Sequence, residues 1–442
     1  MKLAINASRA RSGGAKSHLV GILSEVNPYL YGFKEVHVWS YGELLSLLPK
    51  RPWLKKHIIK MENKSILKQL WWEFFLLPKE IRQNFCNILL NVDAGTVCRF
   101  QPYVVMSRDM LSYEPGEMYR YGISFSLLRL IIIKFVQNSS LKNSMGSIFL
   151  SKYAGNVIQK STGLLRNTIY IQHGVSDNFR SDEPPCNWPE KNNRSINCLY
   201  VSNIAPYKHQ WNVIRAIKKL RKEGFNLNLT LTGGGIAGGN KIAQALLKNE
   251  LDLSDPQSNF VKNIGFIEQE KLPNILKKAD IFIFASSCEN MPNTLLEAMA
   301  SGLPIACSNR GPMPEILQSA GVYFDPEKPI NLANAIKKLI QDKNYREKIA
   351  KDAMLLSTNY SWKRCSKETF LFLKESVTNS EIFFISKHFI FELIFINLVS
   401  LPYKKTFFLK LISSIFSNRA STESSFFTAL SKRSIWYCEL NL

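Results

Sequence analysis

Residues 284–304 read F-A-S-S-C-E-N-M-P-N-T-L-L-E-A-M-A-S-G-L-P, and this stretch decides the fold that we expect. It follows Ile281–Phe284, a short apolar segment typical of a buried strand. Pro292 suits a first helical turn, where its missing N–H would be unpaired anyway, and Gly302 suits the left-handed residue after a helix end. The stretch therefore predicts a strand, a loop, a helix and a further strand that begins at Pro304.

Two carboxylates, Glu289 and Glu297, lie eight residues apart in this stretch. The pattern places Glu289 on the loop at the carboxyl end of the strand, and Glu297 on the helix that follows. Open α/β sheets bind ligands at that edge, and the N–H groups at a helix start attract phosphate. We therefore expect both acids to line a cleft that binds a nucleotide sugar.

Length and composition indicate a globular protein of two domains. The chain has 442 residues, of which 45% are hydrophobic and 12% aromatic. Its start, Met1–Asn6, enters a strand pattern directly, without the long apolar region of a secretory signal. Scattered cysteines without a C-x-x-C pair indicate reduced, buried thiols rather than disulfides or a zinc site. They stand at positions 86, 98, 186, 198, 288, 307, 365 and 438. These features favour a cytoplasmic protein.

Strand and helix patterns alternate along the first half, which predicts a mainly parallel, doubly wound sheet. Candidate strands are Leu3–Asn6, Val36–Trp39, Asn87–Asn91, Tyr103–Ser107, Ser147–Ser151 and Thr168–His173, with helices near 15–26, 64–76, 118–138 and 152–160. The polar, proline-rich residues 181–194 then interrupt the alternation, as is typical of a domain junction.

The alternation resumes in the second half. Candidate strands are Asn197–Val201, Asn226–Thr232, Phe260–Ile264, Asp280–Phe284, Pro304–Cys307 and Val322–Phe324, with helices near 207–222, 240–250, 331–341, 343–356 and 361–375. We expect two Rossmann-like domains, 1–185 and 186–375, followed by an apolar and basic extension, 376–442. Within the extension, Ile382–Leu401 is apolar but contains Lys387 and Glu392. Each would cost about 2.5–3.5 kcal/mol near the middle of a spanning helix, which favours interfacial or core-packed helices.

A net charge of +22 calls for an anionic partner, either nucleic acid or a membrane surface. No zinc-finger spacing or RNP-type aromatic run indicates nucleic acid. Lys56, Lys60, Lys64 and Lys68 recur every four residues and would align on one helical face. They predict a helix on an anionic bilayer. The alternatives are a solvated face of a core-packed helix, or a loop broken near Lys60.

Two glycine-rich turns and one lysine are further candidates. Gly13 and Gly14 follow the first strand, where they would let a ligand approach the backbone, although many such turns use glycine only for tightness. Gly233 and Gly234 occupy the corresponding place in the second half, without P-loop or G-x-G-x-x-G spacing. Lys208 lies where a strand end passes into a helix, and its ammonium could face a diphosphate.

Several segments together resemble family 4 of the retaining nucleotide-sugar glycosyltransferases, over about residues 1–375 and most densely over 196–318. The E-x7-E signature of that family matches Glu289 and Glu297. Other matching segments are S-G-G-A at 12–15, Y-V-S-N-I-A-P-Y-K at 200–208, N-I-G-F-I at 263–267 and N-R-G-P-M-P-E-I at 309–316. The sequence Y-K-H-Q-W-N-V at 207–213 looks most like that of bacterial lipopolysaccharide and O-antigen enzymes.

The resemblance implies an α/β GT-B fold, with two Rossmann-like doubly wound domains facing a cleft and a helical C-terminal extension. It implies a retaining transfer of a sugar from a nucleotide diphosphate to a glycan acceptor, lipid-linked, in bacterial surface polysaccharide synthesis. Glu289 would bind the sugar and stabilise developing positive charge, Glu297 would bind the ribose, and Lys208 would offset leaving-group charge. The remaining implied donor-binding residues are Asn290, Met291, Pro292, Asn293, Thr294, Leu295, Gly233, Gly234, Phe266, Ile267 and Asn203.

One departure concerns Asn203, where many family members carry an arginine. Arg108 or Arg310 would then have to supply the second cation. On the acceptor side, Gly13, Gly14, Arg108, Asp109 and His173 are expected to border the cleft. His173 could instead be a strand-end residue bonded to backbone, and Asp109 could either orient the acceptor or pair with Arg108.

No D-x-D sequence occurs, so we expect no metal and no other cofactor. The expected partners are a nucleotide sugar, a glycan or lipid-linked glycan, and the anionic inner face of the plasma membrane, but no nucleic acid. An epimerase or phosphorylase of the same fold would need an extra acid/base group or a cofactor lysine, for which the sequence gives no signal. A non-catalytic basic scaffold would not need the ligand-binding pattern at 200–318.

Overall fold

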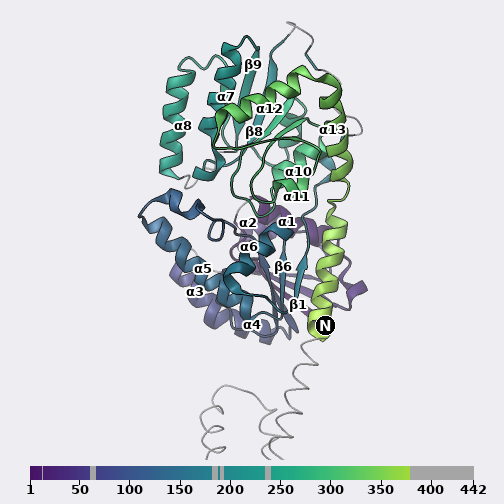
Figure 1. Ribbon diagram of the computed structural model, residues 1–442. Helices are drawn as coiled ribbons and strands as arrows, with labels where there is room; N and C mark the ends of the chain where they lie inside the picture. Colours follow the sequence, from purple (N-terminus) through teal and green to yellow (C-terminus); the bar gives the residue numbers. More distant parts are fainter. Residues whose placement is uncertain (12, 60–65, 182–187, 190–193, 234–239, 379–442) are drawn as a thin grey trace, which may run out of the picture. The chain divides into compact units, whose positions relative to one another are not determined.

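The computed structural model describes residues 1–378, except residue 12 and the ranges 60–65, 182–187, 190–193 and 234–239. Within these residues the chain forms two parallel β-sheets, each flanked by helices (Figure 1). The two parallel, helix-flanked sheets expected from the alternating pattern are therefore confirmed.

The first sheet has seven strands in the order β3-β2-β1-β4-β5-β6-β7. The strands are β1 (Lys2–Asn6), β2 (Glu35–Ser40), β3 (Leu54–Ile58), β4 (Ile88–Asn91), β5 (Tyr103–Ser107), β6 (Gly146–Phe149) and β7 (Thr168–Tyr170). Its longer helices are α1 (Gly13–Glu25), α2 (Gly42–Leu47), α3 (Ile66–Trp71), α4 (Leu77–Gln83), α5 (Phe125–Asn143) and α6 (Lys152–Thr162). Short turns are η1 (Pro28–Tyr31), the π-helical η2 (Trp72–Leu76), η3 (Glu117–Tyr121) and η4 (Asp177–Phe179).

The second sheet has six strands in the order β10-β9-β8-β11-β12-β13. The strands are β8 (Ile196–Val201), β9 (Leu227–Thr232), β10 (Val261–Asn263), β11 (Ile281–Phe284), β12 (Ile305–Ser308) and β13 (Val322–Phe324). The helices are η5 (Pro206–Lys208), α7 (Gln210–Lys222), α8 (Lys241–Ser254), α9 (Leu272–Leu276), α10 (Asn293–Ala300), α11 (Met313–Leu317), α12 (Pro329–Gln341) and α13 (Lys343–Ser357). A further helix covers residues 362–378.

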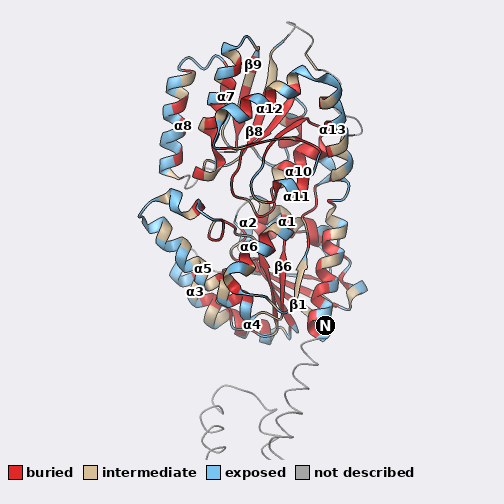
Figure 2. Ribbon diagram, viewed as in Figure 1, coloured by how far each residue is buried: buried red, intermediate tan, exposed pale blue. Residues whose placement is uncertain are grey.

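Central strands of both sheets are buried on both faces, as in parallel sheets covered by helices (Figure 2). All four residues of Ile281–Phe284 are buried, as their apolar run predicted. One hydrophobic cluster continues from first-sheet residues such as Leu150 and Ile171 to Met291 and Leu295 of the second domain. The expected helix end is also confirmed, because Gly302 adopts a φ of 71°. This packing fixes the strand ends that carry the candidate site.

The helix over 362–378 packs on the first domain. The ring of Trp362 lies 5.7 Å from that of His18, and the ring of Phe370 lies 5.8 Å from that of Phe33. A Cβ atom on Gly21 of α1 would come 2.3 Å from the Trp362 ring, so only glycine permits this approach. The segment follows the second domain in sequence, but its contacts are with the first.

The helix predicted around Lys56 is wrong, because Leu54–Ile58 forms the edge strand β3, paired in parallel with β2. The Lys56 ammonium donates to the carbonyls of Leu45 at 2.8 Å and Leu48 at 2.7 Å. Lysines are common on such edges because they block pairing with other chains. Lys56 therefore does not share a helical face with Lys68, which lies on α3. Lys60 and Lys64 lie outside the described residues.

The helix predicted near 118–138 is shifted to α5. Gly122 has a φ of 60°, and the Ser124 hydroxyl accepts a hydrogen bond from the Leu127 amide at 3.3 Å. These two residues set the start of α5 seven residues later than the apolar pattern suggested.

Six of the cysteines lie among the described residues, and all six are free and buried, as predicted. Cys186 and Cys438 fall outside those residues, as does Ile382–Leu401. No helix in the described part of the chain combines the length and apolarity required to cross a bilayer.

Candidate functional site

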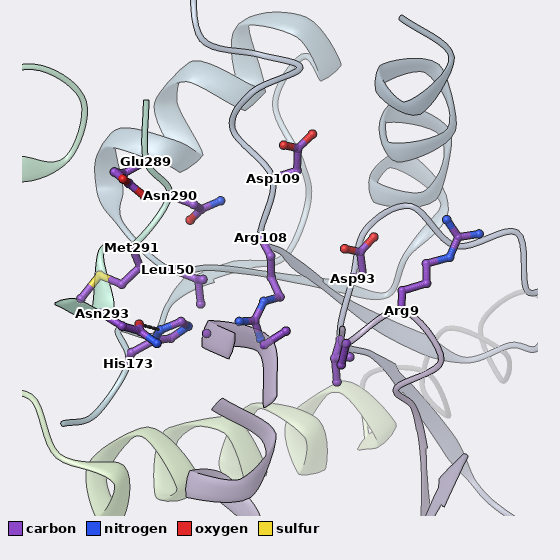
Figure 3. A pocket seen from close by; sticks show the side chains of 14 residues that line it. Arg9, Asp93, Arg108, Asp109, Leu150, His173, Glu289, Asn290, Met291 and Asn293 are labelled. Atoms are coloured by element: carbon purple, nitrogen blue, oxygen red, sulfur yellow. Dashed lines mark hydrogen bonds between the residues drawn. The ribbon is translucent and has the colours of Figure 1, made fainter. Parts of the chain in front are cut away.

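A cavity of about 290 Å³ lies at the carboxyl ends of strands from both sheets (Figure 3). It is bordered by residues that follow β1, β4, β5, β6, β7 and β11. They are Arg9, Ala10, Gly14, Ala15, Val92, Asp93, Arg108, Asp109, Leu150, His173, Glu289, Asn290, Met291 and Asn293. Strand order reverses between β1 and β4 in the first sheet and between β8 and β11 in the second. Such reversal points are the usual ligand sites of open α/β sheets.

Glu289 lies on the loop between β11 and α10, as predicted, and forms an ion pair with Lys208. The side chains are only 10% exposed for Lys208 and 15% for Glu289. Burial alone would lower the pKa of Lys208, but the charge of Glu289 and the nearby Tyr200 raise it above its ordinary value. The site therefore holds a permanent cation beside a carboxylate.

Strand pairing explains why Lys208 and Glu289 meet although 81 positions separate them. They follow β8 and β11, which are adjacent in the sheet. The Tyr200 hydroxyl donates to the Lys208 carbonyl at 2.7 Å, and the Ser287 amide donates to the Tyr207 carbonyl at 2.9 Å. These bonds hold the two strand-end turns together, so the ion pair is a product of the sheet order.

His173 borders the cavity, and its Nδ1 lies 2.6 Å from the Asn293 side-chain oxygen. Its alternative role, bonded only to backbone, is therefore excluded. Burial, with the charge of Arg108, lowers the pKa of His173 to about 3, so the ring is neutral. With Nδ1 donating to Asn293, Nε2 is an acceptor that has no partner among the described residues. Buried acceptors of this kind indicate a ligand or water.

Arg108 and Asp109 follow β5 directly and border the cavity, and no ion pair joins them in the described chain. The Arg108 guanidinium lies 3.0 Å from Nδ1 of His18. Burial lowers the pKa of Arg108 to about 10 and raises that of Asp109. Asp109 accepts hydrogen bonds from the Leu111 amide at 2.9 Å and the Ser112 hydroxyl at 2.7 Å. Arg108 therefore remains available as a cation at the cavity.

Glu297 lies on α10 as predicted, but, unlike Glu289, it does not border this cavity. Its side chain is buried, the residue being 5% exposed, and it does not border the cavity. One carboxylate oxygen accepts from Gln269 at 2.6 Å, and the other has no partner among the described residues. Burial raises the pKa of Glu297 to about 7.

The segment between the two acids divides into lining and supporting residues. Asn290, Met291 and Asn293 border the cavity. Asn290 donates to the Ser107 carbonyl at 3.3 Å, while its side-chain oxygen is buried without a described partner. The supporting residues Pro292, Thr294 and Leu295 are at least partly buried and do not border the cavity.

Four other predicted residues lie at the same edge of the second sheet, outside the cavity: Asn203, Gly233, Phe266 and Ile267. Gly233 has a φ of 108°, and a Cβ there would lie 2.7 Å from the Ser202 carbonyl oxygen, so glycine is required. Gly234 lies outside the described residues. Gly13 does not border the cavity either, whereas a Cβ on Gly14 would lie 3.2 Å from the Asn293 amide nitrogen. Arg310 is half exposed and pairs with Asp325 at 3.2 Å.

Sequence reasoning missed Arg9 and Asp93, which lie across the cavity from Glu289 and Asn290 (Figure 3). Arg9 is held at 2.7 Å by Glu73, a fully buried acid on the π-helical turn η2. Both missed residues closely follow predicted strands, β1 and β4, and that position was the available signal. Among the described residues, no group of three or more potential metal ligands gathers.

Comparison with known sequences gives a family match in the second half of the chain. Residues 187–355 match the family described as glycosyl transferases group 1. The O-antigen chain mannosyltransferase B of Escherichia coli is 28% identical over 113 residues, which cover 26% of this chain and 30% of that protein. The amylovoran biosynthesis glycosyltransferase AmsK of Erwinia amylovora is 30% identical over 129 residues, covering 28% and 30%. The alignments thus span less than a third of each relative.

Comparison with solved structures covers most of the chain. Sucrose-phosphate synthase of Thermosynechococcus elongatus has a TM-score of 0.67 at 15% identity, covering 84% of this chain and 97% of that one. Anabaena HepE in complex with UDP-glucose has a TM-score of 0.64 at 18% identity, covering 86% and 100%. WaaG, a glycosyltransferase of lipopolysaccharide biosynthesis, has a TM-score of 0.62 at 13% identity, covering 84% and 99%. At these identities the likeness establishes the fold alone.

Proposed function

We propose a reaction for this chain from the premise that, through residues 187–355, it belongs to glycosyl transferases group 1 and has the GT-B fold. The reaction moves a sugar from a nucleotide diphosphate to a glycan acceptor, with retention of the anomeric configuration. The observation that carries the proposal is the buried Lys208–Glu289 ion pair beside a cavity lined by both domains.

The leaving diphosphate requires positive charge fixed in advance. When the bond between the sugar C1 and the diphosphate oxygen breaks, negative charge collects on the phosphate and positive charge at C1. Lys208 and the first N–H groups of α10 stabilise the phosphate, and Glu289 stabilises C1. The acceptor oxygen bonds to C1 on the face that the phosphate leaves, and its proton passes to a phosphate oxygen. Atoms and charges balance without a further co-reactant.

The donor's nucleotide is assigned to the second domain. The unpartnered oxygen of Glu297 supports a role in binding ribose hydroxyls, because a buried acceptor without a hydrogen bond is costly. The complex of Anabaena HepE with UDP-glucose shows that a protein of this fold binds a nucleotide sugar. The nucleotide sugar is the substrate, and we propose no cofactor.

We further propose that transfer needs no metal ion. The chain contains no D-x-D sequence, and Lys208 already provides a cation at the donor edge. Arg108, which borders the cavity, is the better candidate for the second cation that Asn203 does not supply, because Arg310 pairs with Asp325 outside it.

The acceptor is proposed to be a lipid-linked glycan of a bacterial surface polysaccharide, used at the cytoplasmic face of the membrane. The O-antigen and amylovoran relatives support this class. On the first-domain side, Arg9, Asp93, Asp109 and His173 offer both charges and a neutral acceptor to sugar hydroxyls. That mixture suits a polar glycan better than an apolar ligand.

The test is an assay of the purified full-length chain with a panel of nucleotide sugars and lipid-linked acceptors. Glu289→Gln is expected to lower transfer by about 10²–10³, the usual loss for a preorganised electrostatic group. Glu268→Gln, at an exposed acid paired with Lys271, is the matched control. Product NMR reports the anomeric configuration, and added chelator reports metal dependence. Full activity of Glu289→Gln would refute the mechanism.

A further inference from the structure

Helix α5 presents an apolar stripe to solvent. Phe125, Leu128, Ile132 and Phe135 are 92%, 53%, 53% and 71% exposed. Their spacing of three and four residues places them on one face of the helix. Ile123, just before the helix, is 105% exposed. Figure 2 shows most of α5 coloured as exposed. An apolar patch of this kind marks an interaction surface.

The opposite face of α5 fixes the direction of the stripe. Gln137, Ser140 and Leu141 are buried against the first domain. The Lys134 ammonium lies 5.4 Å from the centre of the Tyr113 ring, so this lysine also packs inward. Gln137 donates to Asp109 at 3.4 Å, which connects the inner face of α5 to a cavity-lining residue. The stripe therefore cannot turn inward without breaking these contacts.

The sequence that surrounds the stripe carries charge of one sign. Residues 118–176 contain no Asp or Glu, although the chain has 35, and they contain seven Lys or Arg. Arg129 and Lys142 on α5 are exposed. Apolar side chains accompanied only by basic ones complement a surface with anionic head groups over an apolar layer.

We propose that this stripe (Ile123, Phe125, Leu128, Ile132 and Phe135) docks the protein on an anionic lipid bilayer. The helix lies in the interface plane, with its apolar side chains among the acyl chains and Arg129 and Lys142 at the head groups. This deepens the proposed function, because the Gln137–Asp109 contact places the acceptor side of the cavity next to the docking helix. The bilayer contact is thereby assigned to α5 instead of to the lysines at positions 56, 60, 64 and 68.

The test uses the full-length protein and sedimentation with vesicles of phosphatidylcholine, with or without phosphatidylglycerol, and no substrate. The combined variant Phe125→Asp, Ile132→Asp and Phe135→Asp is expected to bind anionic vesicles at least tenfold more weakly, since three buried apolar groups are lost. The matched control combines Leu253→Asp on α8 and Leu355→Asp on α13, which are 65% and 71% exposed, and is expected to bind like the parent. Thermal melting confirms that each variant is folded.

Three results would overturn the docking proposal: unchanged vesicle binding by the stripe variant, equal binding of the parent to neutral and anionic vesicles, or a parent dimer that the stripe substitutions dissociate. Light scattering after size exclusion measures the last. Transfer to a soluble acceptor is assayed separately. Loss of vesicle binding with transfer intact identifies the surface, whereas vesicle binding without any transfer refutes only the proposed reaction.

Discussion

The two sheets contribute to one cavity in different ways. The second sheet supplies four residues of one short loop and helix start, Glu289, Asn290, Met291 and Asn293, and Lys208 neutralises the acid. The first sheet supplies between one and four residues after each of five strands, including Arg9, Asp93 and Arg108. A contiguous, charge-paired segment suits a constant ligand, the activated donor. Dispersed residues on separate loops can change one at a time, which suits a variable acceptor.

The largest expected effect breaks the charge pairing of the second-sheet side. Lys208→Ala should lower kcat by about 10²–10³, because the leaving group loses its fixed cation. It also leaves Glu289 buried without a partner, which should cost about 3–5 kcal/mol of unfolding free energy. Arg310→Ala, at an exposed pair, is the control and should change little. If Lys208→Ala and Arg310→Ala lowered kcat equally, Lys208 would not be the fixed cation that stabilises the leaving group.

The next largest effect concerns Glu297, the buried acid on α10 of the second domain. Because burial raises the pKa of Glu297 from 4.5 to about 7, the carboxyl stays protonated in the folded chain while it ionises in the unfolded chain. Its contribution to stability is full below pH 4.5 and is lost as the pH rises to 7. Relative to Glu297→Gln, the parent should therefore lose about 3 kcal/mol across that window.

Denaturant unfolding of the parent and Glu297→Gln at pH 4.5, 6 and 8 measures this difference. Glu268→Gln, at an exposed acid, should give no such pH-dependent loss. A constant difference between the parent and Glu297→Gln would mean that folding does not raise the pKa of Glu297.

A smaller effect is expected on the first-sheet side. Asp93→Asn keeps the shape of the side chain and the acceptor for the Gly95 amide, which now lies at 2.7 Å. It removes a charge that would strengthen hydrogen bonds to acceptor hydroxyls. The KM for the acceptor should rise about tenfold with kcat nearly unchanged, since such a bond contributes about 1.5–3 kcal/mol. A fall in kcat with an unchanged acceptor KM would place Asp93 on the donor side instead.

The smallest effect is expected from Gly13 and Gly14, two neighbouring glycines at the start of α1, of which Gly14 lies next to Asn293 of the second domain. A Cβ on Gly14 would press on Asn293, the partner of His173, whereas a Cβ on Gly13 has nothing within 4 Å. Gly14→Ala should lower kcat/KM by a few-fold, and Gly13→Ala should leave it unchanged while stabilising the chain by about 0.4–1 kcal/mol. Steady-state kinetics and thermal melts of the pair check both statements. Identical kinetics would show that α1 does not position Asn293.

Sequence patterns predicted most elements because parallel strands buried on both faces are uninterrupted apolar runs, as at Ile281–Phe284. The patterns failed where a segment's position in the sheet, and not the spacing of its side chains, decided its secondary structure. The residues around Lys56 have helix-like spacing but lie at the open edge of the first sheet, where pairing with β2 supplies the backbone hydrogen bonds. The motif at 289–297 predicted that Glu289, Asn290, Met291 and Asn293 line the cavity. Arg9 and Asp93 were not predicted, because no motif marks them.

The sequence by itself determined the alternation of strands and helices, the placement of Glu289 on a loop and Glu297 on a helix, and the strand end that carries Lys208. These features depend on local periodicity and capping, which neighbouring residues encode. Only the tertiary structure decided that Lys208 pairs with Glu289, that Glu297 is buried, and that the apolar stripe of α5 faces outward. Those outcomes depend on strand order and on which surfaces become covered, and segments far apart in the chain set both.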